Sequence, residues 1–151
     1  LCITTSTGPD AVSGIYRRPI LFLNWMPIFD LWSWSNAMHV PKTLVWKESG
    51  KQLTCKEYID HSYFSTERYH KAGIKIVNLT SKEILNSVQE CWQRIQGKWK
   101  DSEEDFEQQK RFWEYLEQSP DFSKWHGWKH PNNKIGTTWL RTHKGFFIQK
   151  K

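Results

Sequence analysis

Residues 1–23 read LCITTSTGPDAVSGIYRRPILFL and contain two short apolar runs separated by a turn and a helical pattern. Residues 1–4 and 20–23 are the apolar runs, and the unbroken second run is typical of a strand buried on both faces of a parallel sheet. Pro9 suits the first turn of a helix, where its missing N–H costs nothing. Apolar side chains then recur at helical spacing at Ala11, Val12, Ile15 and Tyr16. The order strand, helix, strand predicts a βαβ unit.

The rest of the chain alternates further strand and helix signals. Residues 44–46 and 74–77 read as strands, and residues 52–53 could pair with the first of these in a hairpin. Capping residues predict helices that begin after Thr54, Thr80 and Ser102, and a last helix is expected from about Lys134. Residues 25–41 are apolar without a clean period, which indicates a long loop or a short helix. Trp92, Trp113 and Trp139 fall on apolar helix faces and are expected in the core.

These signals predict an α/β fold, a partial Rossmann-like parallel sheet with flanking helices. The expected organisation is one partial domain over residues 1–151, with a βα core over residues 1–97 and a helical C-terminal segment over residues 98–151. Because the chain opens inside an apparent core strand, we expect it to be part of a longer protein.

Composition narrows the class of protein. The 151 residues are 38% hydrophobic and 25% charged, and no apolar run approaches the roughly 18 residues of a membrane-spanning helix. Ten tryptophans exclude disorder as the main state. The net charge of +6 suits an anionic partner. Three scattered cysteines and no signal-peptide pattern fit a reducing, cytoplasmic location, and no ligand spacing predicts a metal site.

The turn after the first strand is the strongest candidate for a ligand site. It carries the hydroxyls of Thr5, Ser6 and Thr7, followed by Gly8. In open parallel sheets, ligands bind at the carboxyl ends of strands, where helix N-termini attract anions. An ordinary turn rich in capping residues remains an equal alternative. Asp10 would repel a phosphate, so it either caps the helix or accepts hydrogen bonds from sugar or ribose hydroxyls. Asn24 ends the second strand and could reach the same edge of the sheet.

The segment TSTGPDAV, followed by RRPILFLN, resembles the donor-binding half of GT-B glycosyltransferases. More closely, it resembles a group of bacterial glycosyltransferases linked to surface polysaccharide synthesis. The resemblance extends weakly over nearly the whole chain, through residues 41–42, 53–54, 112–113 and 135–136. Its most specific part is residues 5–24.

The resemblance implies that a nucleotide-sugar donor is the substrate, with no further cofactor and no metal. Thr5, Ser6, Thr7 and Gly8 would take the donor diphosphate. It also implies that an N-terminal acceptor domain and the first strands of the donor domain precede this chain, so that the chain alone would be inactive. The acceptor would be lipid-linked or a saccharide, and the enzyme cytoplasmic or peripheral to the inner face of the membrane. No catalytic base carries over.

The chain departs from the related heptosyltransferase pattern. That pattern has an Asp before the Thr-Gly pair and a His three residues after the Gly, where this chain has Ser6 and Ala11. Heptose as the donor sugar is therefore in doubt. Two other classes of function stay open. A basic, aromatic-rich module for single-stranded nucleic acid is the main alternative, although no Lys/Arg stripe supports it. A carbohydrate-binding module that uses Trp125 and Trp128 ranks last.

Overall fold

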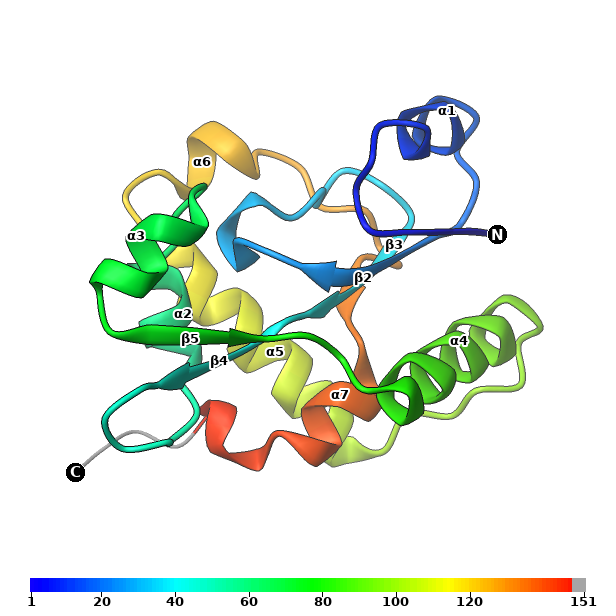
Figure 1. Cartoon of the computed structure of the whole chain (residues 1–151). Helices are drawn as coiled ribbons and strands as arrows, with labels where there is room; N and C mark the ends of the chain where they lie inside the picture. The colour runs from blue at the N-terminus through cyan, green and yellow to red at the C-terminus, as the bar shows by residue number, and fades with distance from the viewer. Residues whose placement is uncertain (148–151) are drawn as a thin grey trace.

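A four-stranded parallel sheet, in the order β1-β2-β3-β6, forms the centre of the computed structural model, which describes residues 1–147 (Figure 1). The expected βαβ unit is confirmed as β1 (Cys2–Thr4), α1 (Asp10–Ile15) and β2 (Ile20–Trp25). All but one residue of β2 are buried, as its unbroken apolar run predicts. The chain therefore has an α/β fold with helices flanking a parallel sheet.

The second half of the sheet differs from the expectation for residues 25–41. This segment holds a short 3₁₀ helix, η1 (Ile28–Asp30), and then a fully buried strand, β3 (Ala37–Pro41), which pairs with β2. The apolar pattern of η1 and β3 has no common period because one element is helical and the other is extended. His39, in the middle of β3, also interrupts the apolar pattern by which a core strand is recognised in a sequence.

Each face of the sheet is covered by different elements. Leu21, Met38 and Lys134 lie opposite one another on adjacent strands and therefore share a face. The helix α4 (Ser81–Ile95) packs on that face, while α1 lies on the other side of the sheet (Figure 1). The apolar side chains of α1 do not join the core, since Val12, Ile15 and Tyr16 are exposed.

A second, two-stranded sheet follows the first. It pairs β4 (Thr43–Trp46) with β5 (Ile74–Val77) in antiparallel fashion. The hairpin expected between residues 44–46 and 52–53 is reduced to one bridge between Val45 and Gln52. The longer pairing goes to β5 because the helices α2 (Cys55–Asp60) and α3 (Thr66–Lys71) return the chain alongside β4.

The expected helix starts are largely confirmed. Complete capping boxes begin α2 at Thr54, α4 at Thr80 and α5 (Glu103–Glu117) at Ser102. Gly97, with φ of 69°, ends α4 in the left-handed conformation that glycine adopts without strain.

The C-terminal segment is less purely helical than expected. After α5 and the short α6 (Phe122–Trp125), residues Lys134–Ile135 form β6, which pairs with β3 and completes the parallel sheet. The helix expected from about Lys134 is α7 (Thr137–Thr142), followed by η2 (Lys144–Phe147). The last four residues of the expected segment lie outside the described residues.

The tryptophans divide between core and surface. Trp139 is buried as expected, but Trp92 is 51% exposed on α4. No helix within residues 1–147 is long and apolar enough to cross a bilayer.

Candidate functional site

The hydroxyl-rich turn lies at the carboxyl end of β1. Thr5, Ser6, Thr7 and Gly8 are all exposed there. Ser6 and Gly8 adopt positive φ angles of 65° and 102°, which bend the chain sharply into α1. Within residues 1–147, the three hydroxyls of the turn make no hydrogen bond, so they remain free to bind a ligand.

Asp10 is directed into the turn and away from solvent. Its side chain is buried, and Oδ1 accepts hydrogen bonds from the Gly8 N–H at 2.9 Å and from the Thr4 hydroxyl at 3.3 Å. The Thr4 hydroxyl oxygen in turn accepts the Ser6 N–H at 3.1 Å. Two backbone donors that an anion could have used are thus satisfied by the protein itself. Asp10 therefore stabilises the conformation of the turn.

Asn24 lies at the same edge, at the end of β2. The sheet register places Thr4 opposite Phe22, two residues before Asn24. Asn24 has a positive φ of 54°, and its Oδ1 accepts the Leu79 N–H at 2.8 Å. The side chain therefore ties β2 to the segment that leads into α4, while its amide nitrogen makes no hydrogen bond within the described part of the chain.

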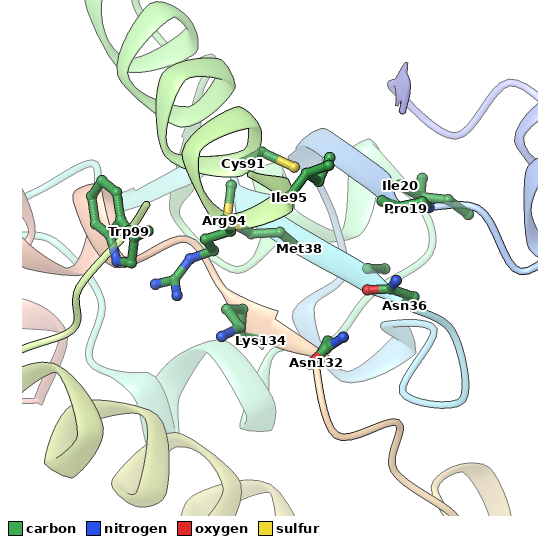
Figure 2. Close-up of a pocket in the computed structure, with 11 residues that line it drawn as sticks. Pro19, Ile20, Asn36, Met38, Cys91, Arg94, Ile95, Trp99, Asn132 and Lys134 are labelled. Atoms are coloured by element: carbon green, nitrogen blue, oxygen red, sulfur yellow. The ribbon is translucent and has the colours of Figure 1, made fainter. Parts of the chain in front are cut away.

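A hollow with several polar side chains lies at the opposite edge of the sheet (Figure 2). It is a cavity of about 390 Å³ beneath the C-terminal half of α4, at the amino ends of β2, β3 and β6. Its polar lining consists of Asn36, Arg94, Asn132 and Lys134, and its other walls include Met38, Cys91, Ile95 and Trp99. The sequence gives no signal for this site, because its side chains come from four separate segments.

Arg94 links this cavity to a buried polar cluster. Its guanidinium donates to Glu90 at 3.0 Å, to Asp101 at 2.7 Å and to the Thr137 hydroxyl at 2.8 Å. Burial and the neighbouring Arg94 charge lower the pKa of Lys134. Lys134 forms no ion pair or side-chain hydrogen bond within residues 1–147.

His39 and His126 have structural roles. His39 is fully buried, and its Nε2 accepts the Trp32 N–H at 3.2 Å. Burial lowers its pKa to about 3, so the ring is neutral. His126 bridges the Ser33 hydroxyl and the Phe29 carbonyl. No group of three or more His, Cys, Asp or Glu side chains in the described chain could hold a metal ion.

Trp34 and the two lysines that follow the apolar segment lie in different parts of the fold. Trp34 packs against Gly14 near the end of α1, toward the amino edge of the sheet and away from the hydroxyl-rich turn. Lys47 donates to the His70 carbonyl at 3.1 Å beside β5, and only Lys42 follows the carboxyl end of a parallel strand.

Comparison of the chain with protein-family models, with curated proteins and with solved structures gives no match.

Proposed function

We propose that this chain is the donor-binding part of a GT-B-type glycosyltransferase, in which residues 5–8 hold the diphosphate of a nucleotide sugar. The observation that carries the proposal is the exposed, hydroxyl-rich turn at the carboxyl end of a parallel strand. This is the edge where open α/β sheets bind ligands. The resemblance of residues 5–24 to the donor-binding half of such enzymes supports the same assignment.

The chemical role of the turn is electrostatic. As the bond to the sugar breaks, negative charge develops on the departing diphosphate, and fixed donors lower the energy of that state. Thr5, Ser6 and Thr7 supply three free hydroxyls, while the bond from Gly8 to Asp10 holds the turn in shape. Asp10 thus acts as a positioning residue, with its carboxylate buried.

The rest of the proposed enzyme would supply the acceptor site. In this proposal, an acceptor domain and the first strands of the donor domain precede the chain and add to the free edge of β1. A lipid-linked or saccharide acceptor and a role in bacterial surface polysaccharide synthesis in the cytoplasm follow from the resemblance. The catalytic base would come from the preceding domain or from the cleft between domains.

Binding of UDP and GDP to the full-length protein tests the turn. We expect Gly8→Val to weaken binding of the preferred nucleotide at least tenfold, because a β-branched residue is strained at a φ of 102° and would distort the turn. Gly50→Val is the matched control. Gly50 also has a positive φ, of 66°, with open space around it, but lies in the turn after β4.

Equal nucleotide affinity in Gly8→Val and wild type would exclude the turn as the diphosphate site. Micromolar binding of single-stranded RNA that falls steeply with salt, without nucleotide binding, would favour the nucleic-acid alternative instead. The exposed tryptophans are a weak basis for that alternative, since Trp92 lies on α4 whereas Trp34 and Trp128 line a separate hollow beside α1.

A further inference from the structure

The cavity beneath α4 is separate from the proposed donor site. Residues 5–8 follow the carboxyl end of β1, whereas Asn36, Asn132 and Lys134 lie at or just before the amino ends of β3 and β6. Since all four strands are parallel, the two sites lie at opposite edges of the same sheet. At about 390 Å³, the cavity is within the size range of small-molecule sites.

Lys134 is the charged side chain of this cavity that has no ion pair within residues 1–147. The carboxylates of Asp101 and Glu90 interact with its charge, but both are already paired with Arg94 at 3.0 Å or less. Figure 2 shows the Lys134 and Arg94 side chains projecting into the same space, with the Asn36 and Asn132 amides on the other side. A partly buried ammonium without an ion pair is costly for the free protein, and a bound anion would offset that cost.

The Trp99 side of the cavity is held in place by two contacts. The Trp99 indole N–H donates to Asp101 at 2.9 Å. The guanidinium of Arg94 lies over the Trp99 ring, 5.0 Å from its centroid. The side-chain amides of Asn36 and Asn132 make no hydrogen bond in the part of the chain that the structure describes. The cavity thus combines a cation, two free amides and a rigid aromatic wall.

We propose that this cavity binds a small organic anion, whose phosphate or carboxylate group contacts Lys134 and whose remainder packs between Trp99 and Ile95. Asn36 and Asn132 would hydrogen-bond the oxygens of the ligand. The competing explanation is that Lys134 only balances the charges of Glu90 and Asp101. The two explanations differ in what removal of the ammonium does to the free protein.

The test is calorimetric titration of the full-length protein with inorganic phosphate and, separately, with acetate. Lys134→Met keeps the length of the side chain and removes the charge. We expect it to weaken binding of the preferred anion at least tenfold and to leave the melting temperature of the free protein unchanged or raised. Lys98→Met, at an exposed lysine after α4, is the matched control and should bind as wild type. Gly8→Val should also keep this binding, which separates the cavity from the donor site.

Each outcome of the titration supports or overturns the proposal. Phosphate binding alone identifies a phosphorylated ligand, and acetate binding alone identifies a carboxylate. Failure of wild type to bind either anion overturns the proposal. Equal anion affinity in Lys134→Met and wild type also overturns it, and a lower melting temperature in that variant would then show that Lys134 is a structural counter-charge.

Discussion

At the residue scale, Glu90 is a buried carboxylate that joins two helices. It is fully buried on α4, and it accepts hydrogen bonds from the backbone N–H groups of Thr137 at 2.9 Å and Thr138 at 2.7 Å. Its carboxylate thereby caps the N-terminus of α7 and also pairs with Arg94. A glutamate in the middle of a helix gives no sign of this role, because the two threonines whose N–H groups it accepts lie more than 40 residues away.

Glu90→Gln should therefore lower the free energy of unfolding by about 3 kcal/mol, since it leaves Arg94 underpaired and sets an amide N–H₂ against backbone donors. Urea unfolding measures the change. Glu114→Gln is the control, because Glu114 is exposed and its ion pair with Lys110 is long, at 3.7 Å. Loss of this pair should lower the free energy of unfolding by less than about 0.5 kcal/mol. Similar stabilities for the two variants would contradict the capping role.

At the element scale, Asp105 performs two tasks for α5. Its Oδ2 completes the capping box by accepting the Ser102 N–H at 2.7 Å, and both of its oxygens bind Arg141 of α7. The capping box is local and was predictable from the spacing of residues 102–105. The contact with α7 was not predictable, because it depends on how two helices pack.

This pair gives the chain a pH dependence. Hydrogen bonds from Arg141 hold the pKa of Asp105 at about 2, below its usual value of 3.8. Because the folded-state pKa is the lower one, the stabilisation is complete above about pH 5 and is lost as the pH falls through 3.8 toward 2. The pKa difference corresponds to about 2 kcal/mol.

We expect the free energy of unfolding, measured between pH 5 and pH 2, to lose this stabilisation in wild type and to fall less in Arg141→Met. Lys110→Met, at an exposed lysine on α5, should follow wild type. The assignment fails if Arg141→Met keeps the full wild-type dependence between pH 5 and pH 2.

At the scale of the whole molecule, one side of the chain is left apolar. On α4, Leu85, Trp92 and Ile95 are exposed along the side away from Glu90 and α7. Ile3 of the edge strand β1 lies opposite Leu21, so it is on the same face of the sheet as α4, and it is 49% exposed. In the proposed enzyme, the preceding strands and helix of the donor domain would cover this surface.

The 151-residue chain by itself should therefore bind the dye ANS, and Trp92→Glu should reduce the dye fluorescence at least twofold by placing a charge in the surface. Phe106→Glu is the control, because Phe106 is also an exposed aromatic residue but lies on α5. Equal fluorescence of the two variants would show that the apolar side of α4 is not a continuous binding surface.

The sequence by itself determined the elements whose signals are local: the initial βαβ unit, the buried β2 strand and the capped starts of α2, α4 and α5. Their causes lie within a few residues, in turns, caps and hydrophobic spacing. Only the tertiary structure decided that β3 and the two-residue β6 complete the sheet, that Asp10 faces inward, and that Lys134 and Arg94 share a cavity. These features depend on contacts between segments up to about a hundred residues apart, such as Met38 beside Lys134. The sequence pattern of one segment does not indicate which distant segment it will contact.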